Sequence, residues 1–356
     1  MKKILVVDDS ALMRRVLCDI INSDERFQVQ DRATNGLEAL DLLSRKTYDA
    51  VVLDVNMPQM NGLELLKELQ KRKIPAKVMM ASTDTREGAK TTLDALELGA
   101  LDFVHKPNNA MDCRNDVFKE KMLEILAVVA DSNPPVASKA FSITDSKTSR
   151  KVVELVGKHA TSVTGNKIVA LASSTGGPKA LQSVIPRLPK NLKAPVVIVQ
   201  HMPAGFTASL AERLDSLSQL RVKEAAEGDV LEAGKVYIAM GGKHLNIQTS
   251  SGRYTIHYTD QPSREGVKPC ANYMYESLRD SRYDQVVCVV MTGMGADGTE
   301  GIKHLKEKKK IHVIAQEAST CAVYGMPKSV VTAGLSDQIV PLDQIAQEII
   351  MNVGVK

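Results

Sequence analysis

Three aspartates stand directly after apolar segments of the kind that form buried β-strands. Asp8 and Asp9 follow the first such segment, and Asp54 follows another further along the chain. The carboxyl ends of parallel strands meet at one edge of a sheet, where ligands bind. Clustered carboxylates attract a hard cation such as Mg²⁺, and the cation would let Asp54 attack a phosphoryl group despite the like charges. These residues therefore predict a Mg²⁺-assisted phosphorylation site.

A hydroxyl and an ammonium group are expected at the same edge. Ser82 ends the next apolar strand and Lys106 follows a short one, so both are candidates to contact phosphoryl oxygens. The alternative is that the Asp-Asp-Ser sequence at 8–10 is only a helix N-cap. The polar groups at the other strand ends favour the phosphorylation site over this alternative.

Ser174, His201 and Asp297 form a second set of polar residues after apolar strands. Ser174 precedes Thr-Gly-Gly, so its hydroxyl would be exposed and would face backbone N–H groups and a positive helix dipole. At one sheet edge the three side chains can act as nucleophile, base and orienting acid in acyl transfer. The alternative is that Ser-Thr-Gly-Gly is a phosphate-binding turn.

The serine does not match the nucleophile elbow of the α/β-hydrolases. Ala172 stands where the G-x-S-x-G pattern has its first glycine, and the order Ser…His…Asp differs from the Ser…Asp…His order of that fold. The other histidines are interpreted as structural, with His244 the least certain because two glycines precede it. They are His105, His159, His244, His257, His304 and His312.

Two α/β domains must position these residues. In residues 1–125 apolar runs alternate with helical patterns, which predicts a parallel sheet with helices on both faces. The expected strands are Ile4–Val7, Ala50–Leu53, Lys77–Met80 and Asp102–Val104, and the expected helices are Met13–Ile21, Gly62–Gln70, Gly88–Leu98 and Val117–Val129. Residues 126–166 are rich in Ser, Thr and Lys and predict an exposed linker, with one amphipathic helix near Val152–Val156.

The same alternation resumes at residue 167 and continues to residue 356. The expected strands are Ile168–Ala172, Pro195–Gln200, Val236–Ala239, Tyr254–Tyr258, Gln285–Met291 and His312–Gln316, and the expected helices are Pro178–Ile185, Thr207–Leu217, Cys270–Leu278 and Gly298–Lys308. The predicted fold class is α/β with two doubly wound parallel-sheet domains, the first flavodoxin-like and the second Rossmann-like.

Composition agrees with two globular domains and argues against several classes of protein. The 356 residues are 44% hydrophobic and 25% charged, as in ordinary globular proteins. A formal net charge of +4 is weak for a nucleic-acid binder. No apolar run approaches the ~20 residues that span a bilayer, and Asp8-Asp9 interrupt the N-terminal apolar run too early for a signal peptide. We therefore expect a cytoplasmic protein without membrane insertion. The five cysteines form no CxxC pair, which argues against a zinc site.

Residues 1 to about 125 resemble the receiver domain of two-component response regulators. The resemblance rests on Val6-Val7-Asp8-Asp9-Ser10, Leu53-Asp54 with Met57-Pro58 and Asn61-Gly62, Ser82, and Lys106-Pro107. It implies that a histidine kinase phosphorylates Asp54, and that Mg²⁺ is held by Asp8, Asp9, Asp54 and the backbone of Asn56. Phosphorylation would then shift an equilibrium between inactive and active conformers.

Residues 167–356 resemble the catalytic domain of the chemotaxis protein-glutamate methylesterases, the CheB family. The matching motifs are Ser174-Thr175-Gly176-Gly177-Pro178, Gln200-His201-Met202-Pro203 with Gly205-Phe206-Thr207, Thr292-Gly293-Met294-Gly295 with Asp297-Gly298, and Gln316 through Pro327. By position, the resemblance implies a triad of Ser174, His201 and Asp297 that needs no metal. It also implies an oxyanion hole of backbone N–H groups near Thr175 and Met294. The implied reaction is hydrolysis of glutamate methyl esters on methyl-accepting chemoreceptors in chemotaxis, with deamidation of specific glutamines.

Three departures from the family pattern bear on substrate detail. Ala172-Ser173 replaces Gly-Ala, Met240 replaces a proline, and Pro269-Cys270-Ala271-Asn272 replaces Pro-Ser-Val-Asp, so that Asn272 lacks a carboxylate. Two other functions are considered. The intact triad argues against a non-enzymatic receiver adaptor, and a receiver-linked DNA-binding regulator would need a helix-turn-helix in a basic output domain.

Overall fold

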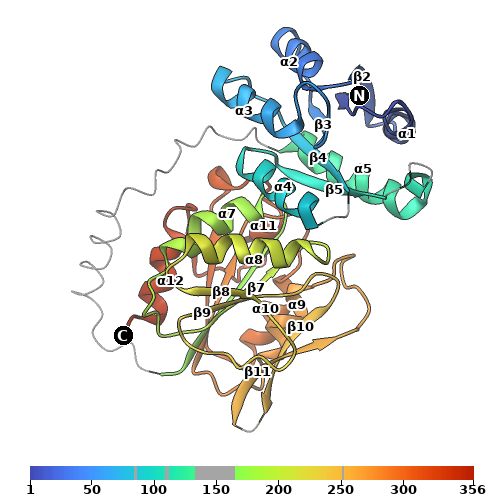
Figure 1. The fold of residues 1–356 in the computed structure, drawn as a ribbon. Helices are drawn as coiled ribbons and strands as arrows, with labels where there is room; N and C mark the ends of the chain where they lie inside the picture. Colours follow the sequence, from blue (N-terminus) through green and yellow to red (C-terminus); the bar gives the residue numbers. More distant parts are fainter. Residues whose placement is uncertain (84–85, 108, 110–111, 133–164, 251) are drawn as a thin grey trace. The chain divides into compact units, whose positions relative to one another are not determined.

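The computed structural model of the chain describes residues 1–83, 86–107, 109, 112–132, 165–250 and 252–356. The chain forms two compact units, Met1–Ala140 and Phe141–Lys356 (Figure 1). The helix expected near Val152–Val156 lies outside the described residues. None of the helices in the described ranges is long and apolar enough to cross a membrane.

The first unit is a five-stranded parallel sheet in the order β2-β1-β3-β4-β5. Its strands are β1 (Lys2–Val7), β2 (Phe27–Ala33), β3 (Ala50–Asp54), β4 (Val78–Thr83) and β5 (Asp102–Lys106). Its α-helices are α1 (Ala11–Asn22), α2 (Gly36–Arg45), α3 (Gly62–Arg72), α4 (Arg86–Glu97) and α5 (Asp116–Asp131). After β1 the chain adds β2 on one side and β3 on the other, which makes the carboxyl ends of β1 and β3 the switch point of the sheet.

The strand β2 and the helix α2 of the first unit were not predicted from the sequence, and the last helix crosses the expected end of the first domain. β2 is an edge strand with a half-exposed pattern, so it lacks the apolar run that marks the central strands. The helix α2 follows it and begins at an Asn35 cap. The last helix, α5 (Asp116–Asp131), extends slightly beyond both ends of the expected Val117–Val129 and past residue 125, where the first domain was expected to end. Its residues Leu126 and Val129 are buried.

The second unit contains a seven-stranded parallel sheet in the order β14-β13-β12-β6-β7-β9-β8. Its strands are β6 (Lys167–Ser173), β7 (Val196–Gln200), β8 (Arg221–Glu224), β9 (Lys235–Ile238), β12 (Gln285–Val290), β13 (Ile311–Gln316) and β14 (Gln338–Val340). The strands β10 (His244–Ser250) and β11 (Arg253–Thr259) form a separate antiparallel hairpin. The α-helices are α7 (Gly177–Val184), α8 (Phe206–Leu217), α9 (Ala271–Ser277), α10 (Thr299–Lys306), α11 (Met326–Thr332) and α12 (Ile345–Val353).

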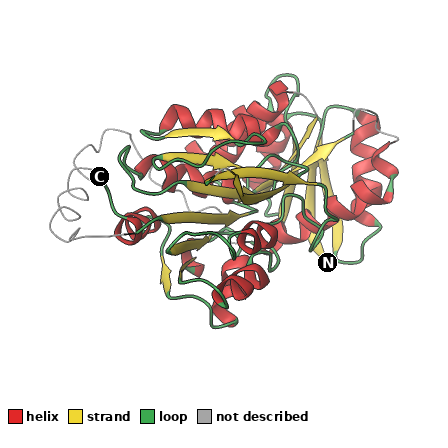
Figure 2. Cartoon of the chain, turned by 90° about the horizontal axis from the view of Figure 1, so that it is seen from below, coloured by secondary structure: helices red, strands yellow, loops and turns green. Residues whose placement is uncertain are grey.

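Helices cover both faces of this larger sheet (Figure 2). On one face, alternate residues of β6, β7 and β12 pack with buried residues of α9, α10 and α11 and of the hairpin. The chain adds β7, β9 and β8 on one side of β6, and β12, β13 and β14 on the other. The switch point therefore lies between β6 and β12. The predicted α/β class with two doubly wound parallel sheets is confirmed.

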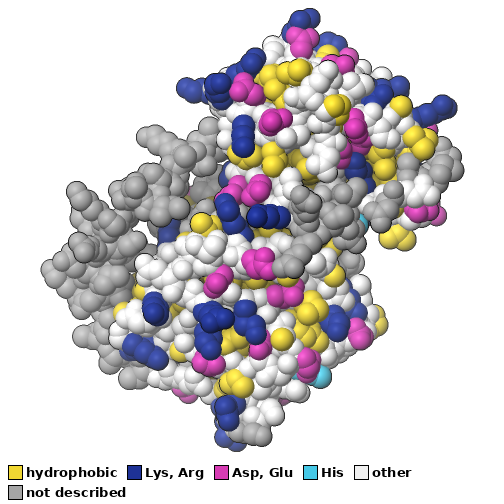
Figure 3. Space-filling model, viewed as in Figure 1, with side chains coloured by type: hydrophobic (Ala, Val, Ile, Leu, Met, Phe, Trp, Pro, Cys, Tyr) yellow, Lys and Arg dark blue, Asp and Glu magenta, His cyan; other side chains and the backbone are white. Residues whose placement is uncertain are grey.

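The elements that sequence patterns missed in the second unit are mostly short. β8 has four residues and β14 has three, and both lie at edges of the sheet. The strand β10 and the helices α11 and α12 were also not predicted. On the face shown in Figure 3, basic and acidic side chains are interspersed on the surface of each unit rather than gathered by sign.

Candidate functional site

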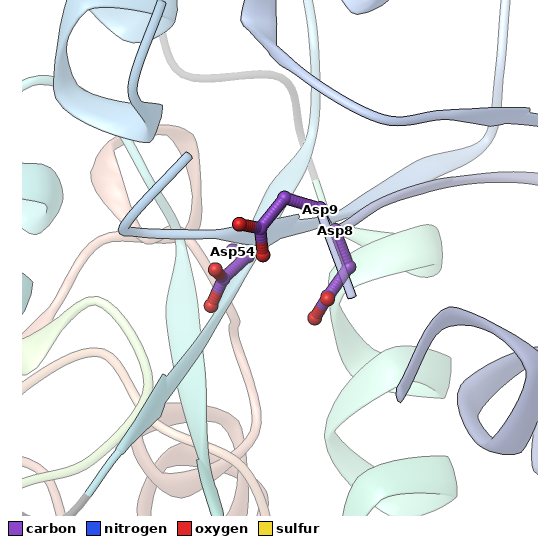
Figure 4. A group of neighbouring side chains, drawn as sticks. All are labelled: Asp8, Asp9 and Asp54. Carbon is purple, nitrogen blue, oxygen red and sulfur yellow. The ribbon is translucent and has the colours of Figure 1, made fainter. Parts of the chain in front are cut away.

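The first candidate site is the carboxylate cluster at the switch point of the smaller sheet. Asp8 and Asp9 follow β1, and Asp54 is the last residue of β3. One carboxylate oxygen from each residue lies within 4.8 Å of the other two (Figure 4). Asp8 and Asp54 are buried, whereas Asp9 is exposed. Three oxygen donors at this spacing fit a hard divalent cation with part of its coordination shell open to water.

The ammonium group of Lys106 lies against two of these carboxylates. Nζ is 3.0 Å from Oδ2 of Asp8 and 2.5 Å from Oδ1 of Asp54. Burial by itself lowers the pKa of Lys106, but the charges of Asp54 and Asp8 outweigh burial and raise it. Burial raises the pKa of Asp54, and the charge of Lys106 opposes that rise. Lys106 therefore stays charged and partly neutralises the cluster.

The other residues predicted for this site are placed by the sheet. Ser82 is the residue after Ala81, which pairs with Asp54 across β3 and β4. Its buried hydroxyl lies 2.8 Å from that of Thr92 on α4. Asn56 is exposed two residues after Asp54. A Cβ on Gly62 would lie 2.4 Å from the Asp54 carbonyl oxygen, so only glycine lets α3 begin this close to the strand end.

The second candidate site is built on the ends of β6 and β7. Ser173 and Gln200 pair across these strands, and Ser174 and His201 follow them. The side chain of Gln200 joins the two ends. It accepts a hydrogen bond from the Ser173 hydroxyl at 2.7 Å and donates to the carbonyls of Ser174 and His201 at 3.0 and 3.1 Å. In the described part of the chain no hydrogen bond joins the Ser174 hydroxyl to His201, as is common before a substrate binds.

Asp297 reaches the histidine from the loop after β12. Its Oδ2 lies 2.7 Å from Nε2 of His201. The His201 side chain is 9% exposed and that of Asp297 is 3% exposed, so water competes little for this contact. With Nε2 on the carboxylate, Nδ1 is the ring nitrogen left for Ser174. This is the reverse of the general Ser-His-Asp template, in which Nδ1 faces the acid.

The Asp297 carboxylate is saturated with donors. The N–H groups of Ala271 and Asn272 reach Oδ2 and Oδ1 at 2.6 and 2.9 Å, and the Cys270 thiol lies 3.0 Å from Oδ1. Burial alone raises the pKa of Asp297, but the hydrogen bond and charge of His201, with the Cys270 and Ala271 donors, hold that pKa below its usual value. Asp297 is therefore an anion at neutral pH.

The loop after β12 also fixes the backbone around the serine. The Ser174 N–H donates to the Thr292 carbonyl at 3.0 Å, and the Thr292 hydroxyl donates to the Thr175 carbonyl at 2.9 Å. A Cβ on Gly293 would lie 2.7 Å from the Ser174 Cβ, so a side chain there would displace the serine. The segments that carry Thr175 and Met294 are thus held together beside Ser174, as an oxyanion hole requires.

All three departures from the family pattern have a structural role in their surroundings. In Ala172-Ser173 it is the Ser173 hydroxyl, which donates to Gln200. The N–H of Met240 donates to the Tyr258 hydroxyl at 2.9 Å. The buried Asn272 side chain accepts hydrogen bonds from the Gly298 and Gly301 N–H groups at 3.1 and 2.6 Å and donates to Glu265 at 2.8 Å. Ala172 is fully buried inside β6.

The remaining histidines lie outside the two clusters. His244 is buried with its ring centroid 4.7 Å from that of Tyr273. His257, His304 and His312 contact Glu227, Glu276 and Gln338. His159 lies outside the described residues. The sequence analysis named Gln200 and Thr292 only as members of matched motifs and Cys270 only within a departure, and it assigned none of them a role in the site. The position of Gln200 directly before the histidine was a usable signal for its role.

Comparisons with known proteins match both units. A family model described as CheB methylesterase matches residues 169–349, and one described as response regulator receiver domain matches residues 4–118. The chain is 42% identical over 352 residues to a protein-glutamate methylesterase/protein-glutamine glutaminase of Geobacillus kaustophilus, with 99% of each chain covered. A relative of the same name from Pyrococcus horikoshii is 42% identical over 351 residues, covering 99% of this chain and 93% of the relative.

Solved structures also match, among them one that corresponds to the second unit. The crystal structure of the Thermotoga maritima CheB methylesterase catalytic domain is 42% identical, covers 52% of this chain and 98% of its own, and aligns with a TM-score of 0.51.

Proposed function

The chain belongs to the CheB methylesterase family, and we propose that it hydrolyses glutamate methyl esters on chemoreceptors under the control of a phosphorylated receiver domain. The observation that carries the proposal is the 2.7 Å contact between His201 and the buried Asp297, beside a serine on the adjoining strand end. Deamidation of receptor glutamines would use the same groups, because an amide and a methyl ester present the same carbonyl to the serine.

The hydrolysis proceeds in two halves in this proposal. Nδ1 of His201 accepts the Ser174 proton as Oγ attacks the ester carbonyl, and the oxygen of the tetrahedral intermediate faces the N–H groups of Thr175 and Met294. Asp297 stabilises the imidazolium. The imidazolium then protonates the departing methoxide, and methanol leaves. Water, activated by His201, attacks the acyl-enzyme, which releases the glutamate carboxylate and restores the Ser174 proton.

The receiver domain supplies the control. We propose that a histidine kinase of the chemotaxis system phosphorylates Asp54, with Ser82 and Lys106 as contacts for the phosphoryl oxygens. Asp8, Asp9 and Asp54, with the Asn56 backbone, would hold Mg²⁺, which when bound offsets the repulsion between phosphoryl and carboxylate oxygens. The acidic cluster within 4.8 Å fits this ion in donor type and spacing.

The test of the whole proposal is methanol release from methylated receptors. The full chain is incubated with receptor-containing membranes, with and without a small phosphodonor and Mg²⁺. We expect release that depends on Ser174 and increases with phosphodonor. Binding to the receptors without any methanol release would instead support an adaptor.

A further inference from the structure

Asp297 orients His201 in the proposed triad, and four donors orient Asp297. His201 and the Ala271 N–H contact Oδ2, while the Asn272 N–H and the Cys270 thiol contact Oδ1. Two of the four are backbone groups and one is the base itself. The Cys270 thiol is therefore the one donor of the four that a side chain outside the triad supplies.

The environment of Cys270 makes its sulfur a donor. The side chain is fully buried at the N-cap position of α9. Burial, with the charge of Asp297, raises the pKa of the thiol, so the sulfur keeps its proton at neutral pH. An ionised carboxylate only accepts hydrogen bonds. A protonated sulfur 3.0 Å from Oδ1 must therefore point its S–H at that oxygen.

We propose that Cys270 is a positioning residue for the hydrolase site. Its S–H group donates a hydrogen bond to Oδ1 of Asp297, which keeps Oδ2 of the same carboxylate hydrogen-bonded to Nε2 of His201. The inference rests on the proposed triad. Without the thiol, the carboxylate loses one restraint on rotation about its Cβ–Cγ bond. It also keeps more negative charge at the oxygen that faces the imidazole, because a hydrogen-bond donor stabilises and disperses that charge.

Other titratable groups near Asp297 do not compete with this effect. The charge of Asp297 acts on His244 of β10 and on Tyr275 of α9. Burial lowers the pKa of His244 and raises that of Tyr275. Both side chains are thus neutral around pH 7, and the changes expected on substituting Cys270 fall on the contact between Asp297 and His201.

The experiment compares three variants of the full chain. Cys270→Ala removes the donor and Cys270→Ser keeps a donor of similar shape. Cys288→Ala removes another fully buried thiol, on β12, whereas the thiol hydrogen bond to Asp297 among the described residues comes from Cys270. Methanol release from methylated receptors gives kcat and KM between pH 5 and 9, and thermal unfolding checks the fold of each variant. For Cys270→Ala we expect kcat to fall about tenfold, the rate equivalent of one hydrogen bond to a charged group, with KM unchanged.

The pH profile separates positioning from packing. In Cys270→Ala the acid limb of kcat/KM should move to higher pH, because the less screened carboxylate stabilises the imidazolium. Cys270→Ser should restore both kcat and the acid limb, and Cys288→Ala should leave both unchanged. The proposal is overturned if Cys270→Ala matches the parent, or if Cys270→Ser is as impaired as Cys270→Ala. A Ser174→Ala variant in the same assay keeps the two questions apart, since its activity would refute the triad whatever Cys270 does.

Discussion

Asp297 and Asn272 cap each other's helices. The Asp297 carboxylate accepts hydrogen bonds from the first two N–H groups of α9, those of Ala271 and Asn272. The Asn272 side-chain oxygen accepts hydrogen bonds from Gly298 and Gly301 at the start of α10. Each residue thus satisfies donors that the other helix would leave without a partner. The position of the proposed catalytic acid is therefore tied to the packing of α9 on α10.

This reciprocal capping predicts a large loss of stability on substituting Asn272. Asn272→Ala would leave two buried N–H groups without acceptors, which costs about 1–3 kcal/mol each. Urea unfolding of the full chain should show this loss in the transition of the second unit. Asn272→Asp keeps acceptor oxygens for the two N–H groups but loses the hydrogen bond to Glu265 and adds a buried charge beside it. Its loss of stability should therefore be smaller than that of Asn272→Ala without vanishing. Equal losses in both variants would contradict the capping role.

The triad predicts unequal losses of activity. Ser174→Ala removes the nucleophile, and losing such a serine costs about 10⁶ in rate in subtilisin, while losing the aspartate costs about 10⁴–10⁵. Asp297→Ala should therefore retain more methanol release than Ser174→Ala. The matched control is Ser183→Ala. It removes a serine hydroxyl of α7 that donates to the Lys179 carbonyl of the same helix, and this variant should remain active. Undiminished release by folded Ser174→Ala protein would move the nucleophile to another residue.

Both sites could be located from sequence because their residues follow strands. Asp54 and Ser174 each terminate an apolar run, and the carboxyl ends of parallel strands meet at one edge whatever the details of packing. The two switch points then follow from the order of the strands. The edge strand β2 escaped prediction for the opposite reason, since its half-exposed residues carry no apolar run.

The contacts that refine the hydrolase site could not be predicted in this way. Cys270 and Asp297 are 27 residues apart in the chain, and they meet only because α9 packs on α10 beside the end of β12. Neither the secondary-structure propensity of these residues nor the spacing of apolar residues predicts that Cys270 and Asp297 meet. The reversed use of the His201 nitrogens likewise depends on the side from which the Asp297 loop arrives, which a pattern of strands and helices leaves open.

The lowered pKa of Asp297 predicts how stability depends on pH. A carboxyl whose pKa is lower in the folded state than its ordinary value of 3.8 stabilises the fold above that value, and the contribution disappears as pH falls through the folded-state pKa. The difference in unfolding free energy between the parent and Asp297→Asn should therefore shrink as pH falls below about 4. Urea titrations at each pH measure it, and a difference that grows on acidification would contradict the sign.

Phosphorylation predicts a specific loss in the first unit. Asp54→Asn should abolish labelling by radioactive acetyl phosphate in the presence of Mg²⁺, because no other carboxylate of the cluster ends β3. Asp41→Asn is the matched control, since Asp41 is exposed on α2 and pairs only with Arg45 among the described ion pairs. Its labelling should equal that of the parent. Labelling of Asp54→Asn at the parental level would place the phosphorylated residue elsewhere.

The last prediction concerns how the receiver controls the esterase. Each site lies at the carboxyl-end edge of its own sheet. Because the linker joins the two units covalently, the effective concentration of one unit at the other is high. We propose that the unphosphorylated receiver covers the Ser174 site and that phosphorylation of Asp54 loosens this contact. Such a contact must be modest and partly polar, because phosphorylation changes the balance between the two states by only a few kcal/mol.

A fragment of residues 166–356 tests this model. The match to this chain covers 98% of the solved Thermotoga maritima catalytic domain, which supports the use of the fragment as a folded unit. The fragment should hydrolyse a small soluble ester faster than the unphosphorylated full chain and should ignore phosphodonor, whereas the full chain should be accelerated by it. Asp54→Asn in the full chain should stay slow throughout. A small ester is needed because the receiver could also deliver the enzyme to its receptors, so its removal could lower activity on membranes for a different reason. Equal hydrolysis of that ester by fragment and full chain, with or without phosphodonor, would rule out steric inhibition by the receiver.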